Sequence, residues 1–284
     1  MQLAHALRWA LETLEANDVG SPRLNAETLL MFVLNCHRAY LYAHPERELT
    51  EDELQRYKEA VEERSRGVPA QYITGHQEFW GLDFLVSPAV LIPRPETEHL
   101  VETAIEIARE MAQPRIIDVG TGSGCIALAL ENELPKAEVH ATDLSPDALE
   151  IARANAARLR LERVRFHVTD VLEGFPDEFA EIIVSNPPYV GECEADKVQA
   201  QVRKFEPHMA VFGGPQGHEL ICKLIEQSRR VLKPDGWLLI EIGYTQSPML
   251  EKLLQGWDDV HFVPDLQGIP RVAVARRTSA DTRA

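Results

Sequence analysis

The sequence predicts an α/β domain with a mostly parallel sheet, preceded by a small all-helical domain and a short β-hairpin linker. Three observations support this. Helical periodicity alone fills the first 66 residues, a short aromatic segment rich in glycine and proline follows, and strand and helix patterns alternate from residue 96 onward. We therefore expect a helical domain over residues 1–70, a hairpin linker over 71–92 and an α/β domain over 93–284.

The helical domain is indicated by apolar residues that recur with helical spacing over 3–14 and 24–34. The pair Ser21-Pro22 precedes the second segment and is typical of an N-cap followed by proline at the first helical position. A third helix is expected to begin at Thr50, because Thr50 and Glu53 fit a capping box. Together these segments indicate a small helical bundle.

The linker is marked by residues 79–86, which are aromatic or branched and include a glycine. This composition predicts a β-hairpin. Prolines at positions 88, 93 and 95 then interrupt regular structure before the next domain begins.

The α/β domain is predicted from alternating patterns. Ligands of such sheets bind beyond the carboxyl ends of the strands, near the point where the strand order switches. The expected strands are Arg115–Val119, Ala137–Thr142, Val164–Thr169, Glu181–Ser185, Gly236–Ile242 and Arg271–Ala275. The expected helices are Thr97–Met111, Gly124–Glu133, Ala148–Leu159 and Glu219–Leu232.

The composition restricts the possible partners. With 29 basic and 45 acidic side chains the net charge is −16, which argues against stable binding to nucleic acid phosphates. The four cysteines form no C-x-x-C pair and have no histidine cluster beside them, so we expect reduced thiols and no metal site. The start of the chain lacks signal-peptide features, and no apolar run approaches the roughly 20 residues that span a membrane. We expect a cytoplasmic monomer.

A glycine-rich turn follows the first expected strand of this domain. Glycines allow the main chain to approach a ligand, and the helix that follows offers free N–H groups, so the turn suits a nucleotide or a carboxylate. The G-x-G-x-G spacing weakens a nicotinamide interpretation, and the Lys-Ser/Thr ending of a phosphate-binding P-loop is absent. The alternative is a β–α turn with no ligand. The candidate cofactor residues here are Asp118, whose carboxylate could meet an ammonium group, and Gly120, Thr121, Gly122, Ser123 and Gly124.

Acidic residues end the next two expected strands. Asp143 could accept both hydroxyls of a ribose, although Asp143 alone could also be a helix N-cap, in competition with Ser145 and Asp147. Asp170 could accept from an adenine amino group, with Val171 against the ring. Three acids at successive strand ends, beside a glycine turn, indicate a nucleoside site.

The segment Asn186-Pro187-Pro188-Tyr189 follows the fourth expected strand and suits alkylation of a planar amide or amine nitrogen. The Asn186 side-chain carbonyl and the Pro187 backbone carbonyl can accept the hydrogens of the acceptor nitrogen. Two prolines preorganise these acceptors, and Tyr189 can lie flat against the planar group. Acceptors that strengthen as positive charge develops on nitrogen stabilise the transition state without a strong base. The alternative is a rigid turn after a strand.

These motifs resemble those of the class I S-adenosylmethionine-dependent methyltransferases that act on nitrogen. The resemblance implies a Rossmann-like, seven-stranded sheet with an antiparallel last hairpin, and S-adenosylmethionine as cofactor. It implies cofactor contacts from residues 120–124 and from Asp143, Val171 and Asn186. Position 171 holds valine where some relatives carry an aromatic residue, so the adenine would be packed rather than stacked.

Further segments are similar to the bacterial peptide chain release factor glutamine methyltransferases (the PrmC/HemK family). This resemblance implies a class 1 release factor as partner, methylated on the side-chain amide of the glutamine in its Gly-Gly-Gln loop. The helical domain would grip the release factor, and Asn186, Pro187, Pro188 and Tyr189 would contact the glutamine. The matching segments are 72–75, 78–81, 91–98, 206–207 and 212–214.

Three alternatives remain open. A ribosomal-protein glutamine methyltransferase would share the tetrad Asn186-Pro187-Pro188-Tyr189, although residues 94–98 favour the release-factor type. A DNA adenine methyltransferase is disfavoured by the charge of −16 and the lack of a recognisable target-reading domain. A non-catalytic binding module is disfavoured by the intact tetrad. Arg94 and Glu96 could face the cofactor, the release factor or solvent.

Overall fold

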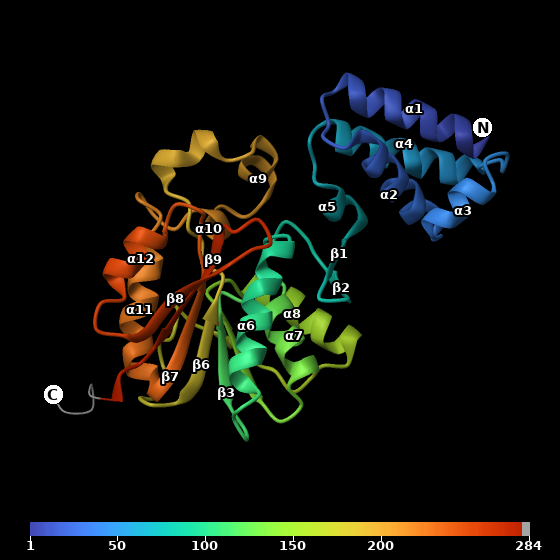
Figure 1. The fold of residues 1–284 in the computed structure, drawn as a ribbon. Coiled ribbons are helices and arrows are strands. Elements are labelled where there is room, and N and C mark those ends of the chain that lie inside the picture. Colours follow the sequence, from blue (N-terminus) through green and yellow to red (C-terminus); the bar gives the residue numbers. More distant parts are fainter. Residues whose placement is uncertain (280–284) are drawn as a thin grey trace. The chain divides into compact units, whose positions relative to one another are not determined.

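The computed structural model describes residues 1–279, and its contacts divide the chain into two compact units, Met1–His76 and Gln77–Ala284 (Figure 1). The division falls inside the segment 71–92 that the sequence predicts as a linker. No helix among the described residues is long and apolar enough to cross a membrane.

The first unit is entirely helical. Its core includes Tyr57, which is fully buried and donates a hydrogen bond through its hydroxyl to the Ala26 carbonyl at 2.9 Å. Burial with this bond lets a phenol enter an apolar core without leaving a polar atom unpaired. The helices are α1 (Leu3–Ala16), α2 (Pro22–Leu34), α3 (Arg38–Ala43), α4 (Glu51–Ser65) and α5 (Ala70–Thr74).

One of the two predicted helix starts has the expected side-chain bonds. At α4 the capping box is confirmed: Glu53 N–H donates to Thr50 Oγ1 at 3.2 Å, and Thr50 N–H donates to the Glu53 carboxylate at 2.9 Å. At α2, Ser21 occupies the N-cap position before Pro22, but its φ of 51° is left-handed and its side chain makes no capping bond. The prediction of a serine cap is therefore right in position and wrong in mechanism.

The hairpin consists of β1 (His76–Phe79) and β2 (Leu82–Leu85), as the sequence predicts. The two turn residues, Trp80 and Gly81, both have positive φ, at 55° and 69°, which matches the twist of a two-residue hairpin turn. Phe79 and Phe84 pack edge to face at 6.2 Å and belong to the core of the second unit.

The second unit contains a seven-stranded sheet of order β5-β4-β3-β6-β7-β9-β8. The pairs from β5 to β7 are parallel, and β9 is antiparallel to both β7 and β8. All six strands predicted from the residues are confirmed, and so is the antiparallel last hairpin implied by the resemblance. The strands are β3 (Arg115–Val119), β4 (Glu138–Asp143), β5 (Arg165–Val168), β6 (Ala180–Ser185), β7 (Leu232–Glu241), β8 (Asp258–Pro264) and β9 (Pro270–Arg276).

Helices cover both faces of this sheet (Figure 1). Neighbouring residues of one strand point to opposite faces, so Ile116 packs with α6, α7 and α8, whereas Ile117 packs with α11 and α12. The helices are η1 (Pro95–Thr97), α6 (Glu98–Ala108), α7 (Cys125–Glu133), α8 (Pro146–Leu159), η2 (Glu192–Lys197), α9 (Ala200–Phe205), α10 (His208–Val211), α11 (Glu219–Val231) and α12 (Ser247–Leu253).

The strand order switches between β3 and β6. From β3 the chain moves outward through β4 to β5, and it then returns to place β6 on the other side of β3. A crevice forms at such a point because the connections leave in opposite directions. The glycine turn follows β3 and Asn186 follows β6, so the fold brings the two main sequence motifs to this crevice.

Candidate functional site

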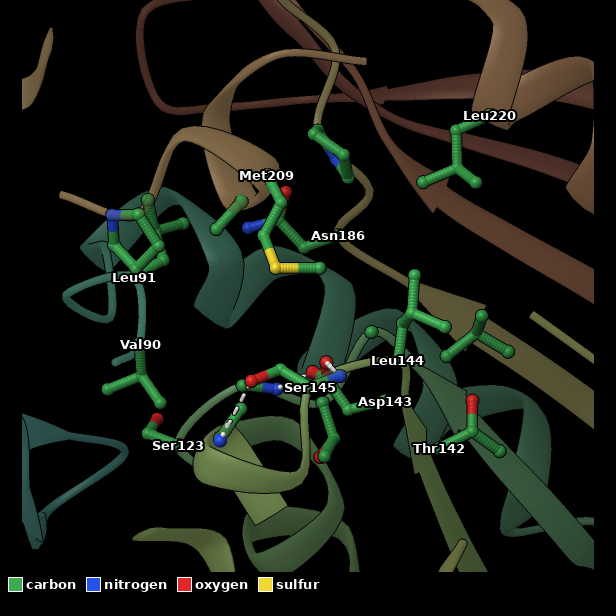
Figure 2. A pocket seen from close by; sticks show the side chains of 18 of the residues that line it. Val90, Leu91, Ser123, Thr142, Asp143, Leu144, Ser145, Asn186, Met209 and Leu220 are labelled. Atoms are coloured by element: carbon green, nitrogen blue, oxygen red, sulfur yellow. Dashed lines mark hydrogen bonds between the residues drawn. The ribbon is translucent and has the colours of Figure 1, made fainter. Parts of the chain in front are cut away.

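A cavity of about 530 Å³ lies at the carboxyl ends of the central strands (Figure 2). This volume is in the usual range for a small-molecule site. The glycine turn, Asp143 and Asn186 line it together with segments that the sequence did not assign. The lining includes Ala89, Val90, Leu91, Pro93, Arg94, Thr97, residues 120–123, residues 142–145, residues 169–171, Asn186, Pro188, Pro207, Met209, Ala210, Phe212, Gly213, Glu219, Leu220 and Lys223.

The glycine turn has the backbone freedom that the motif indicates. Gly120, Gly122 and Gly124 have φ of 74°, 53° and 83°, a region that favours glycine. A Cβ on Gly120 or Gly122 would meet open space, which leaves the main chain accessible from the cavity. Thr121 and Ser123 also line the cavity and are themselves buried.

Gly124 has a different role from the other loop residues. It does not line the cavity, and a Cβ there would lie 3.1 Å from Ala152 Cβ and 3.2 Å from Leu128 Cδ1. Gly124 therefore allows α7 and α8 to approach each other closely. Its assignment as a cofactor contact has no support from this position.

Asp118 lies beneath the glycine turn. Its carboxyl group is fully buried, and its Oδ2 accepts hydrogen bonds from Thr121 Oγ1 at 2.6 Å and from Ala127 N–H at 3.2 Å. Burial raises the pKa of Asp118 to about 7. Its Oδ1 has no partner among residues 1–279, and Asp118 is absent from the cavity lining. The carboxyl group therefore braces the turn, and only its free oxygen remains for a ligand's ammonium group.

Asp143 joins the end of β4 to the glycine turn. Its Oδ2 accepts from Gly122 N–H and its Oδ1 from Ser145 N–H, both at 2.9 Å, and burial raises its pKa. The N-cap of α8 is Ser145, which accepts from Ala148 N–H at 3.2 Å. The capping alternative for Asp143 is thus wrong, and its carboxylate remains on the cavity wall (Figure 2).

Asp170 and Val171 lie on the same wall. Asp170 forms an ion pair with Lys223 Nζ at 2.6 Å, a partner on α11 that the sequence did not indicate. Val171 is buried, and its φ of 58° is unusual for a β-branched residue. Strain of this kind is kept where the surroundings dictate the backbone, and here the Val171 carbonyl accepts from Thr142 Oγ1 at 3.1 Å.

A buried asparagine outside the motifs supports the turn. Asn155 on α8 donates to the carbonyl of Ser123 at 2.9 Å and to that of Leu85 at 3.0 Å, and it accepts from Leu85 N–H at 2.6 Å. It thereby ties the glycine turn to strand β2. Only its position on the inner face of an expected helix could have indicated it.

The tetrad splits into two parts. Asn186 and Pro188 line the cavity, whereas Pro187 is buried and Tyr189 is half-buried, and neither lies on the lining. The amide nitrogen of Asn186 donates to Thr97 Oγ1 at 3.1 Å. Contact of Pro187 and Tyr189 with an acceptor stays a prediction.

Tyr189 is fixed by its surroundings. Its ring packs against the core around α11 and α12, next to Gly243, where a Cβ would lie 3.3 Å from Tyr189 Cδ2. Its carbonyl accepts from Gln246 Nε2 at 2.9 Å, and burial raises the pKa of its phenol to about 12. The phenol is therefore neutral at physiological pH.

Arg94 and Glu96, whose roles the sequence left open, lie in different surroundings. Arg94 lines the cavity and forms an ion pair with Glu206, whose side chain is fully buried and also accepts from Ile92 N–H at 3.2 Å. Glu96 is exposed. The Arg94–Glu206 pair thus joins two segments of the cavity wall that are far apart in sequence.

Two further polar residues near Asn186 were missed by the sequence analysis. Thr97 lines the cavity, and Glu241, at the end of β7, is buried and within hydrogen-bonding reach of the Thr97 hydroxyl. Burial raises the pKa of Glu241 to about 7. An acid at the end of a further parallel strand was the available signal for Glu241.

The cavity suits a ligand with an adenosine and an amino acid part. It offers open glycine backbone, the Asp143 carboxylate and an apolar wall that includes Val171, and the free oxygen of Asp118 lies buried under the turn. No group of three or more potential metal ligands occurs within residues 1–279.

Comparison with known proteins decides the family. The PrmC N-terminal domain family matches residues 5–75, and the methyltransferase small domain family matches residues 97–206. The chain is 57% identical over 281 residues to a release factor glutamine methyltransferase of Koribacter versatilis, with 99% of this chain and 100% of that protein covered. It belongs to the release factor glutamine methyltransferase family. The enzyme of that name from Escherichia coli is 40% identical over 279 residues, with 97% and 99% covered.

A solved structure is similar in fold. The crystal structure of a methyltransferase from Pyrococcus furiosus matches 70% of this chain and 90% of that chain with a TM-score of 0.51 and 20% identity. Family membership makes this protein a methyltransferase whose methyl donor is S-adenosylmethionine. The expected Rossmann-like methyltransferase fold is confirmed.

Proposed function

We propose that this protein transfers a methyl group from S-adenosylmethionine to the side-chain amide nitrogen of the Gly-Gly-Gln glutamine in class 1 peptide chain release factors. One observation in the site supports this most directly: Asn186 is held on the wall of the same cavity that the glycine turn and Asp143 line. The near full-length identity of 57% to a release factor glutamine methyltransferase supports the choice of acceptor. We further propose that it acts as a monomer in the cytoplasm, in translation termination, without stable nucleic acid binding.

The cofactor would be held by the wall that comprises residues 120–123, Asp143, Asp170 and Val171. When bound, S-adenosylmethionine supplies an electrophilic methyl group on sulfur. The Asp143 carboxylate already accepts two backbone N–H groups and keeps lone pairs for ribose hydroxyls. The free Oδ1 of Asp118 is the group suited to the ammonium of the amino acid part.

The acceptor glutamine would be oriented by Asn186 and Pro187. Both offer carbonyl oxygens, which accept the two hydrogens of the amide nitrogen and so direct its lone pair towards the methyl group. As nitrogen becomes positive during transfer, these hydrogen bonds become charge-assisted and strengthen. The amide nitrogen gains the methyl group as the methyl–sulfur bond breaks with its electron pair left on sulfur, which gives S-adenosylhomocysteine. The nitrogen loses one proton, which has become acidic enough to leave to solvent without a dedicated base.

Competing acceptors are distinguished by direct labelling. The protein is incubated with S-adenosylmethionine labelled in its methyl group and with one of three acceptors: a class 1 release factor, ribosomal protein or duplex DNA. Label in the release factor alone is the expected result. Label in the ribosomal protein would move the proposal to the sister specificity, and label in DNA alone would refute it.

A further inference from the structure

Thr97 Oγ1 connects the candidate catalytic amide with a buried acid. It accepts from Asn186 Nδ2 at 3.1 Å, and its hydroxyl lies within hydrogen-bonding reach of the Glu241 carboxyl group. Thr97 and Glu241 are only 2% and 3% exposed, so water is excluded from both. The sheet explains the arrangement: Ser185 on β6 pairs with Ile240 on β7, and Asn186 and Glu241 follow these residues at the same edge.

The donor and acceptor capacities fix the direction of these bonds. An ionised carboxylate can only accept, so the single Thr97 proton is directed to Glu241. The Thr97 oxygen then accepts from Asn186, which must present its NH2 group to Thr97. The Asn186 Oδ1 has no partner among the described residues and remains available in the cavity wall.

We propose that Thr97 and Glu241 are positioning residues that select which end of the Asn186 amide faces the acceptor nitrogen. This inference rests on the proposed function, because it assumes that Asn186 Oδ1 accepts a hydrogen from the glutamine amide. The reverse orientation would place the Asn186 NH2 against the NH2 of the glutamine, with two donors opposed. Thr97 and Glu241 thereby act through Asn186 and do not touch the reacting atoms.

This relay, the chain of hydrogen bonds from Glu241 through Thr97 to Asn186, makes turnover depend on pH. Burial holds the pKa of Glu241 near 7, so protonation occurs in the neutral range. A protonated Glu241 can donate to Thr97, which frees the Thr97 proton for Asn186 and allows the amide to reverse. The value of kcat should therefore rise with pH as Glu241 ionises. The charged and titratable groups that act on Glu241 or feel its charge are Glu96, Arg271, Arg94, Tyr189 and Cys125.

The test compares kcat, the KM for the release factor and the dissociation constant for S-adenosylmethionine in Thr97→Val, Thr97→Ser and Glu241→Gln from pH 6 to 9. Thr97→Val keeps the shape but removes the hydroxyl, and we expect kcat to fall about 10-fold with both other constants within about twofold of wild type. Thr97→Ser keeps the hydroxyl and should restore kcat and its pH dependence. The Glu241→Gln profile should be low and flat, because a glutamine amide can donate to Thr97 at every pH.

Thr103→Val is the matched control, since Thr103 is a buried threonine on α6 whose hydroxyl donates to the His99 carbonyl at 2.7 Å. It should leave kcat and its pH dependence unchanged. If the wild type methylates the release factor and Thr97→Val has the same kcat, the relay is overturned and the proposed function stands. If the wild type does not methylate the release factor, the function itself is refuted. If Thr97→Val does not fold, Glu241→Gln decides: a profile that rises as in wild type overturns the proposal, and a flat one supports it.

Discussion

The carboxylate of Asp143 accepts a hydrogen bond from the backbone N–H of Gly122 at 2.9 Å. An acid at the end of β4 and a glycine after β3 thus form one unit on the cavity wall. The second oxygen of Asp143 accepts from Ser145 at the same distance, so the carboxylate is held from both sides. This geometry makes the position sensitive to the loss of one acceptor atom.

Asp143→Asn should therefore weaken the cofactor site. The new NH2 group cannot accept from a ribose hydroxyl, and this loss costs about 1–3 kcal/mol, or roughly 10- to 100-fold in the dissociation constant for S-adenosylmethionine. Calorimetric titration measures this directly. Asp147→Asn is the control, because Asp147 is exposed in the first turn of α8, and its affinity should match wild type. Unchanged affinity in Asp143→Asn would remove Asp143 from the cofactor site.

Gly124→Ala and Gly120→Ala should differ in stability. Both positions have positive φ, so alanine costs about 1–2 kcal/mol of unfolding free energy at either one. At Gly124 the new Cβ also meets Ala152 Cβ at 3.1 Å, and overpacking adds about 1–3 kcal/mol. Urea unfolding of the two variants without cofactor measures how much unfolding free energy each one loses. Equal losses would contradict the packing role of Gly124.

The sequence predicted the elements whose pattern is local. Strand β3 was found with its observed bounds, since Ile116, Ile117 and Val119 make it mostly apolar, as is typical of a buried parallel strand. The start of β7 shows the limit: the strand was expected from Gly236, but it begins at Leu232 and pairs with β6 through a register shift between Ala180 and Ile182. Strand β8 was missed from the residues, because an edge strand with mixed exposure has no distinct pattern.

The parts of the site that lie within a short sequence motif could be predicted. The glycine turn, Asp143 and Asn186 were found because adjacent residues signal them, and the fold brings them to one cavity. Thr97 and Glu241 lie 144 positions apart, 241 − 97, and only the sheet places them together, so no local pattern could pair them. Gly124 was assigned to the cofactor because it belongs to the same glycine motif as its neighbours, whereas its role depends on packing against α8, which follows later in the chain.

Asp118→Asn should flatten the dependence of stability on pH. The folded pKa of about 7 lies above the ordinary value of 3.8, so the folded state holds a proton that the unfolded state has lost. Between about pH 4 and 7 this carboxyl lowers the free energy of unfolding as pH rises, by at most about 1.4 kcal/mol per pH unit. Urea unfolding of the cofactor-free protein between pH 5 and 7.5 should show a shallower decline in the variant. An identical decline would show that Asp118 is ionised in the folded state throughout.

Asn186→Ala should reduce turnover without abolishing cofactor binding. Removing an acceptor that strengthens in the transition state costs about 1–3 kcal/mol or more, or roughly 10- to 100-fold in the single-turnover rate. Rapid-quench experiments with saturating S-adenosylmethionine and release factor measure that rate. Asn132→Ala, at an exposed position on α7, is the control and should react as wild type does. An unchanged rate in Asn186→Ala would remove Asn186 from the mechanism.

The identity of the methylated atom decides whether the Gly-Gly-Gln glutamine is the acceptor. A purified class 1 release factor is incubated with this protein and S-adenosylmethionine, digested, and sequenced by tandem mass spectrometry, in parallel with a release factor whose Gly-Gly-Gln glutamine is replaced by alanine. We expect one added methyl group on the side-chain amide of that glutamine and none in the alanine variant. A methyl group on another residue, or equal methylation of the alanine variant, would contradict it.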